Sequence, residues 1–122
     1  MDFTIVKRQI ISQYISLYGS DRENDTWSLE ACINVFRYFY RAYYQAFGCP
    51  HPYLRNQTIR EIISGFPRLS GDGYLYGELL VPEEYPVMID AYFEQDFPAC
   101  NYSIAHFMSG NIRQLRYYEN LY

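Results

Sequence analysis

The sequence lacks the features that mark an exported or membrane-spanning protein. No stretch of its 122 residues approaches the roughly 20 consecutive apolar residues that a membrane helix needs. Near the amino terminus, Asp2 comes first and Lys7 and Arg8 follow before an apolar stretch develops, which is not the pattern of a secretory signal peptide. We therefore expect a cytoplasmic protein that has no contact with a membrane.

Cysteine is scarce as well. The three cysteines are odd in number and far apart, so they do not form the pattern of a disulfide framework, and they favour a reducing compartment. The sulfur and nitrogen atoms that zinc prefers as ligands occur in two pairs, Cys49 with His51 and Cys100 with His106. A single proline separates the members of the first pair, which strains a shared tetrahedral site. We expect neither a metal nor a cofactor.

Patterns of catalytic residues are also missing. The turn at residues 70–73, SGDG, is not followed by the Lys and Ser or Thr of a phosphate-binding loop. Asp90 and Glu94 could act as a carboxylate pair, but acid–base catalysis also requires a cleft and shifted pKa values. His51 is expected in a loop, and His106 is expected to be a partly buried histidine bonded to a carbonyl. We expect a protein without enzymatic activity.

Aromatic side chains are abundant, with fifteen tyrosines and eight phenylalanines. The densest stretch is FRYFYRAYYQAF, residues 36–47. Apolar residues recur there at steps of three and four, which is the spacing of one face of an amphipathic helix. This stripe consists of Leu29, Cys32, Ile33, Phe36, Tyr40, Tyr43 and Phe47. We therefore interpret most of these rings as core rather than as a binding surface.

A narrow polar strip accompanies the apolar stripe of this helix. It consists of Glu30, Asn34, Arg37, Arg41 and Gln45. Asp25 and Thr26 offer side-chain oxygens to the free amides at the start of the helix, and Gly48 followed by Pro50 stops it. The pattern predicts a central helix over about residues 27–47, with one side exposed to water.

Shorter helices are predicted on either side of the central one. Residues 4–18 have a periodic apolar face and are followed by Gly19, a helix terminator. Asn56 is positioned to cap a further short helix, which Gly65 and Pro67 would close. Both segments are therefore expected to pack their apolar faces against the central helix.

The remaining chain combines a connector with further helices. Residues 67–83 are predicted as a long exposed loop or a short β-like connector. Pro86 suits the first turn of a helix that runs to Phe97, and residues 101–122 are predicted to form two helices broken near Gly110. The length fits one domain. The fold class is therefore all-α, a compact bundle of five or six helices that forms a single domain over residues 1–122.

Negative charge is concentrated in the last third of the chain. Residues 1–82 contain eight basic and eight acidic side chains, whereas residues 83–122 contain two basic and six acidic ones, which accounts for the net charge of −4. In a helix, Glu83, Asp90 and Glu94 share one face, and Tyr85 is expected at its rim, with Tyr92 as a further candidate. This stripe either serves as a solvated helix face or binds a basic partner surface.

The C-terminal residues resemble the helix-turn-helix family. Ile104 and Ala105, then Ser109 and Gly110, then a spaced apolar series in a second helix follow the pattern of that motif, except that Gly110 stands where an apolar residue is usual. The resemblance implies that the outer side chains of the second helix contact base edges or phosphates. The residues that would bind nucleic acid are Asn111, Arg113, Gln114, Arg116 and Tyr117.

Two hypotheses for the function follow from these patterns. The first is a non-enzymatic protein-binding module that uses acidic and tyrosine-rich surface to bind a partner with a basic surface, because tyrosine is enriched at interfaces. The class that this suggests is a phage or mobile-element inhibitor of a host nucleic-acid-binding or defence protein, such as the anti-CRISPR proteins. The second is DNA binding by the C-terminal helix. The residues predicted to contact a protein partner are Glu83, Glu84, Tyr85, Asp90, Glu94, Tyr74 and Tyr76.

Overall fold

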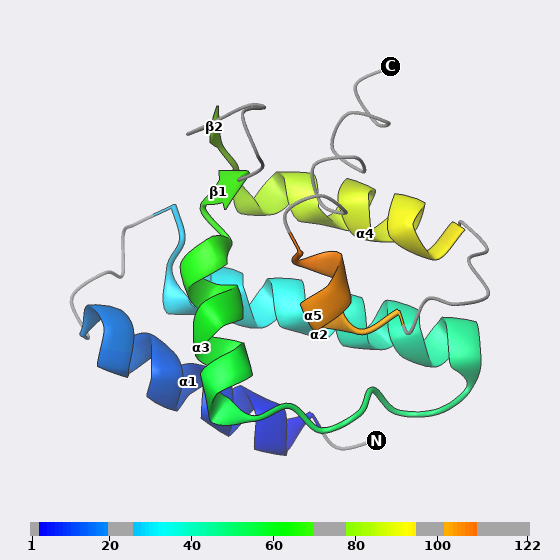
Figure 1. Ribbon diagram of the computed structural model, residues 1–122, viewed down its shortest axis with the longest axis horizontal. Coiled ribbons are helices and arrows are strands. Elements are labelled where there is room, and N and C mark those ends of the chain that lie inside the picture. Colours follow the sequence, from blue (N-terminus) through cyan, green and yellow to red (C-terminus); the bar gives the residue numbers. More distant parts are fainter. Residues whose placement is uncertain (1–2, 20–25, 70–77, 95–101, 110–122) are drawn as a thin grey trace.

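The computed structural model describes residues 3–19, 26–69, 78–94 and 102–109. In chain order the elements are α1 (Thr4–Tyr18), α2 (Leu29–Phe47), α3 (Asn56–Gly65), β1 (Arg68–Leu69), β2 (Glu78–Leu79), the 3-10 helix η1 (Pro82–Glu84), α4 (Tyr85–Glu94) and α5 (Ile104–Phe107). Figure 1 shows α2 across the middle of the molecule, with α4 on one side of it and α1 on the other. The predicted all-α bundle around a central helix is confirmed.

Local side-chain chemistry explains where α2 begins and ends. The Ser28 hydroxyl caps the helix by accepting a hydrogen bond from the Ala31 amide at 3.2 Å, so α2 starts slightly later than predicted from Asp25 and Thr26. At the other end Gly48 has a φ of +70° and its amide donates to the Tyr44 carbonyl at 2.7 Å. The predicted stop at Gly48 is confirmed, because glycine takes this left-handed conformation without strain.

The rings of residues 36–47 divide between core and surface along α2. Phe36, Phe39 and Tyr40 are buried, as the helical spacing predicted. Phe47 was expected to point inward with them, yet 47% of its surface is exposed. Its ring contacts the Phe93 ring at a centroid distance of 6.4 Å, so it packs at the edge of the bundle. Side chains are therefore less completely covered near the C-terminal end of α2, and helical spacing alone does not reveal this.

The helices α1 and α3 pack against each other and are joined by side-chain hydrogen bonds. The Gln9 amide in α1 donates to the Leu54 carbonyl and to Asn56 Oδ1, both at 2.9 Å. Asn56 was predicted to cap α3, but it is the first residue of the helix, and the cap position is Arg55, which makes no side-chain hydrogen bond. The Asn56 side chain therefore ties α3 to α1 instead of capping its own helix.

The connector after α3 contains a small antiparallel pairing. Arg68 pairs with Leu79 and Leu69 pairs with Glu78, and the Leu80 amide donates to the Pro67 carbonyl at 2.8 Å. The two ends of the predicted loop are thus held together as short strands, while residues 70–77 lie outside the described residues. The β-like alternative predicted for this connector is therefore found at Glu78 and Leu79, and the sequence left it open because such a short pairing depends on its partner strand.

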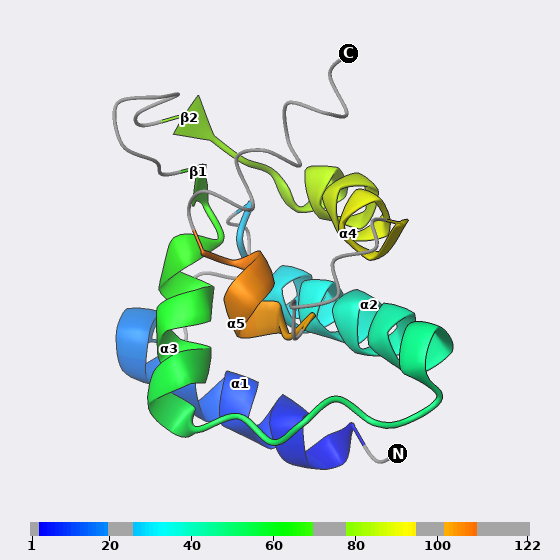
Figure 2. The ribbon, with the colours of Figure 1, turned by 45° about the vertical axis from the view of Figure 1, so that its right-hand side comes forward.

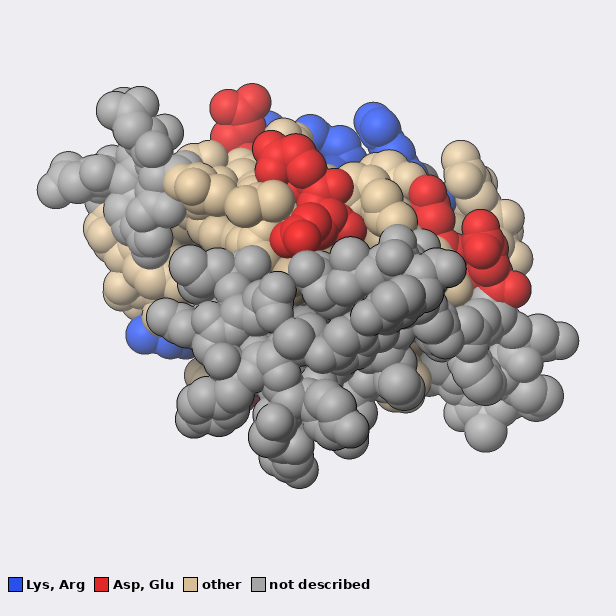
Figure 3. All heavy atoms as spheres, turned by 90° about the horizontal axis from the view of Figure 1, so that it is seen from above, with Lys and Arg blue, Asp and Glu red and all other residues tan. Residues whose placement is uncertain are grey.

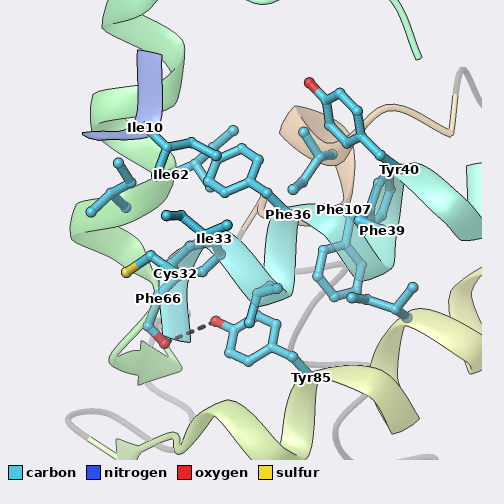
Figure 4. Packing of buried hydrophobic residues seen from close by; sticks show 14 of the residues in the cluster. Ile10, Cys32, Ile33, Phe36, Phe39, Tyr40, Ile62, Phe66, Tyr85 and Phe107 are labelled. Carbon is cyan, nitrogen blue, oxygen red and sulfur yellow. Dashed lines mark hydrogen bonds between the residues drawn. The ribbon is translucent and has the colours of Figure 1, made fainter. Parts of the chain in front are cut away.

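The core is a continuous cluster of aromatic rings, many of which pack edge to face. Phe66 lies between the rings of Phe36, at a centroid distance of 5.5 Å, and Tyr85, at 5.3 Å. Phe107 of α5 reaches Phe39 at 5.5 Å. Figure 4 shows these side chains converging from α2, α4, α5 and the end of α3, and Figure 2 shows α5 beside α2. Such edge-on geometries are favoured because the positive edge of one ring meets the negative face of another.

Three buried aromatic residues bond through their polar tips to backbone carbonyls of the connecting segments. Trp27 Nε1 donates to the Leu80 carbonyl at 2.7 Å, and the Tyr14 hydroxyl donates to the Trp27 carbonyl at 3.0 Å. The Tyr85 hydroxyl donates to the Phe66 carbonyl at 2.8 Å. Each bond satisfies a buried carbonyl and a buried donor at once. The connectors on both sides of the core are therefore held in one arrangement.

Candidate functional site

The most prominent charged surface lies on η1 and α4. Glu83, Asp90 and Glu94 are exposed there, and Val87, which is 51% exposed, lies among them at helical spacing. We refer to these four residues as the acidic face. Figure 3, which views the molecule from the side of α4, shows acidic side chains spread across this surface with uncharged side chains between them. The predicted carboxylate stripe is therefore on one surface, and an apolar side chain lies within it.

A side chain of α2 supports the centre of the acidic face. The Tyr38 hydroxyl donates a hydrogen bond to Asp90 Oδ1 at 2.7 Å. Desolvation, followed by this hydrogen bond and the negative charge of Asp90, raises the pKa of Tyr38 to about 12. The phenol therefore stays protonated at neutral pH and remains a donor. This contact fixes the Asp90 carboxylate relative to α2.

A hollow adjoins the acidic face where the start of α2 meets η1. Its volume is about 360 Å³, and its lining includes Glu30, Asn34 and Tyr38 from α2 together with Glu83 and Pro86. Glu30 and Glu83 thus contribute carboxylates from two different elements to one depression. The size and the negative charge of this hollow suit a long basic side chain from a partner.

The structure corrects the predicted role of Tyr85. It was expected at the rim of the acidic stripe, but it is fully buried, as is Tyr92. Their spacing with Met88 and Ile89 places them on the opposite, inward face of α4. The sequence does contain a signal for this burial, which is the helical spacing of residues 85, 88, 89 and 92. The prediction gave more weight to the general preference of tyrosine for interfaces.

The other predicted contact residues fall into two groups. Glu84 is half-buried, and its carboxylate accepts a hydrogen bond from the Val81 amide at 2.8 Å, so it serves the start of η1. Tyr74 and Tyr76 lie outside the described residues. Of the predicted partner-binding residues, the structure thus brings Glu83, Asp90 and Glu94 together.

The five predicted nucleic-acid-binding residues fall within residues 110–122, which lie outside the described part of the chain. The first helix of the predicted pair is α5, which is only four residues long and is capped by the Ser103 hydroxyl, an acceptor for the His106 amide at 3.2 Å. Ile104 and Phe107 are buried in the core. The DNA-binding hypothesis stays a prediction.

His51, which was expected in a loop, does lie between α2 and α3 but is buried there. Its Nδ1 donates to the Pro52 carbonyl at 2.8 Å, and its Nε2 accepts a hydrogen bond from the Ile104 amide at 3.0 Å. The ring stacks on Tyr40 at a centroid distance of 4.4 Å. Burial lowers the pKa of His51, so the neutral ring joins the segment after α2 to the start of α5.

The two histidines considered as zinc ligands are hydrogen-bonded within the fold. Both ring nitrogens of His51 are engaged within the fold, and His106 Nδ1 is hydrogen-bonded to the Tyr92 hydroxyl at 2.8 Å. This nitrogen of His106 therefore has a phenol as its partner. Cys49 is exposed, and Cys100 lies outside the described residues. In the part of the chain that the structure describes, no three His, Cys, Asp or Glu side chains form a group that could hold a metal ion.

The buried neutral His51 predicts a specific pH dependence of stability. Its ordinary pKa of 6.5 applies to the unfolded chain, and burial lowers the value in the folded state. Stability should therefore be complete above about pH 6.5 and fall by up to about 1.4 kcal/mol per pH unit below it, until the folded-state pKa is reached. Urea unfolding at several pH values between 7.5 and 5 measures this slope.

A single substitution isolates the contribution of His51. In His51→Gln the slope should flatten, because the amide does not titrate. An equal slope in His51→Gln and in the parent would show that His51 is not the titrating group.

Comparisons with protein-family models, with curated proteins and with solved structures found no match to this chain. Among the described residues, no helix combines the length and apolar character needed to cross a membrane. The function must therefore be argued from the surfaces themselves.

Proposed function

We propose that this chain is a non-enzymatic protein-binding module whose acidic face docks on a basic surface of a partner. The observation that carries this proposal is the grouping of exposed Glu83, Asp90 and Glu94 around Val87. An exposed apolar side chain surrounded by charge is the arrangement of an interface, in which the apolar contact is dehydrated and the surrounding charges select the partner.

Two further features support a binding surface rather than a helix face that only contacts water. Tyr38 holds Asp90 at 2.7 Å, which reduces the entropy lost when this carboxylate meets a partner. The hollow next to it, with Glu30 and Glu83 in its lining, offers a second point of attachment for a basic side chain. The acidic face therefore combines a fixed charge with a depression beside it.

A host nucleic-acid-binding or defence protein is the class of partner that this surface suits best. Proteins that bind nucleic acid present lysine and arginine to a row of phosphates. A row of carboxylates can occupy such a surface, which would make the chain an inhibitor of the kind encoded by phages and mobile elements. Acidic residues number 14 of 122, so mimicry of this kind would be limited to the acidic face.

Charge reversal tests the proposal. We expect Glu94→Lys and Glu83→Lys each to weaken binding to the partner retained from the native host by roughly tenfold or more, because complementary potentials become repulsive. Binding should also weaken as salt is added. Affinity of the purified pair, measured by calorimetry, checks both expectations.

The matched control is Glu61→Lys, which makes the same change in net charge on the exposed side of α3. It should leave the affinity unchanged. Equal effects of Glu61→Lys and Glu94→Lys would contradict the proposed surface. Salt-sensitive binding of duplex DNA, lost when Arg113 and Arg116 are replaced with alanine, would instead establish the helix-turn-helix hypothesis.

A further inference from the structure

A second hollow lies away from the acidic face, where α2 passes the start of α1. Its volume is about 400 Å³, within the range of small-molecule sites. The lining consists of Phe3, Arg37, Tyr40, Arg41, Tyr44 and Gln45. Three residues of the predicted polar strip of α2 thus meet three aromatic residues in one depression. In Figure 3, basic side chains lie along one edge of the view, beyond the acidic ones.

The two arginines of this hollow have different surroundings. Arg37 lies over the Phe3 ring at 5.3 Å from its centroid, and its Nη1 donates to Asn34 Oδ1 at 3.2 Å, so its guanidinium is held in place. Arg41 is exposed and makes no hydrogen bond or ion pair with any part of the chain that the structure describes. One helical turn separates the two positive charges, a repulsive arrangement that an anion between them would relieve.

Tyr40, whose side chain is almost fully buried, also lines this hollow. Its side chain is only 5% exposed and its ring is stacked on His51, yet within residues 3–19, 26–69, 78–94 and 102–109 its hydroxyl has no hydrogen-bond partner. Figure 4 shows this hydroxyl pointing away from the ring cluster. Desolvation raises the pKa of Tyr40, so the group stays protonated as a donor. A buried donor without an acceptor is destabilising, and a ligand oxygen would satisfy it.

We propose that this hollow binds a nucleoside monophosphate. Arg37, Arg41 and the Tyr40 hydroxyl are the donors for the phosphate, since guanidinium groups match phosphate oxygens in pairs. The Tyr44 ring, 50% exposed at the rim, provides a face on which a base can stack. Gln45 adds an amide that can bond to a base edge. The net charge of −4 disfavours a long nucleic acid here, because most phosphates of a polymer would be repelled.

Calorimetric titration of the full chain with adenosine monophosphate tests this site. We expect saturable binding, and we expect adenosine alone and inorganic phosphate alone to bind at least roughly tenfold more weakly, since each offers half of the contacts. Arg41→Gln should reduce the affinity roughly tenfold, which is the effect of losing a charged hydrogen bond, and Tyr44→Ala should reduce it similarly. Tyr40→Phe should lower the affinity while leaving the unfolding midpoint unchanged or raised.

The matched controls are Arg55→Gln and Tyr53→Ala, which alter an exposed arginine and an exposed tyrosine outside the hollow. Both should bind adenosine monophosphate as the parent protein does. Absence of binding at millimolar concentration, or equal losses in Arg55→Gln and Arg41→Gln, would overturn the proposal. Equal affinity for inorganic phosphate would also overturn it, because the base would then make no contact. The acidic face plays no part in this experiment, so its outcome is independent of partner binding.

Discussion

Replacing Phe36 with alanine is expected to lower the free energy of unfolding by about 3–5 kcal/mol, the range for a deleted buried aromatic side chain. Phe36 is fully buried, and its ring contacts those of Tyr40 and Phe66 at centroid distances of 6.4 and 5.5 Å. Alanine would leave a cavity and would remove contacts within α2 and to the end of α3 together. Urea denaturation followed by circular dichroism measures the change.

Arg37→Ala is the control for this substitution, since it alters the neighbouring position on the same helix. The Arg37 side chain contributes a contact with the Phe3 ring and one hydrogen bond near the surface, so a loss of about 1 kcal/mol or less is expected. If Arg37→Ala destabilised the protein more than Phe36→Ala, the helical register of α2 would be wrong.

Tyr85→Ala is expected to cost a similar 3–5 kcal/mol, roughly the loss for a large buried aromatic side chain. The ring packs edge-on against Trp27 at 5.3 Å and against Phe66, and the hydroxyl is bonded to the Phe66 carbonyl at 2.8 Å. Tyr85→Phe should cost about 1–2 kcal/mol, because it leaves that buried carbonyl without its donor. Thermal and urea unfolding of the two variants separate the contribution of the ring to stability from that of the hydroxyl.

These two variants also separate a core role for Tyr85 from a surface role. Tyr85→Phe should leave partner affinity unchanged, because the side chain is not accessible on the acidic face. A Tyr85→Ala protein with the stability of the parent would show that the residue is exposed, as its predicted place at the rim of the acidic stripe requires.

Local features of the chain were predictable to a useful degree. The helices α1 and α2 end at Gly19 and Gly48 as predicted, because a helix terminator acts on the few residues beside it. The grouping of Glu83, Asp90 and Glu94 followed from helical spacing alone. The cap of α3 was predicted wrongly, because the Asn56 side chain bonds to Gln9, 47 residues away in the sequence.

The sequence by itself determined the all-α class, the central aromatic helix and the grouping of Glu83, Asp90 and Glu94, since each follows from the helical spacing of residues close together in the chain. Only the tertiary structure decided the roles of single polar groups. Tyr38 meets Asp90 across 52 residues, and His51 meets Ile104 across 53. It also brought Phe3 of the chain start to the hollow that Tyr40 and two arginines line. Helical periodicity places a side chain on one face of its own helix, whereas its hydrogen-bond partner depends on how distant elements pack.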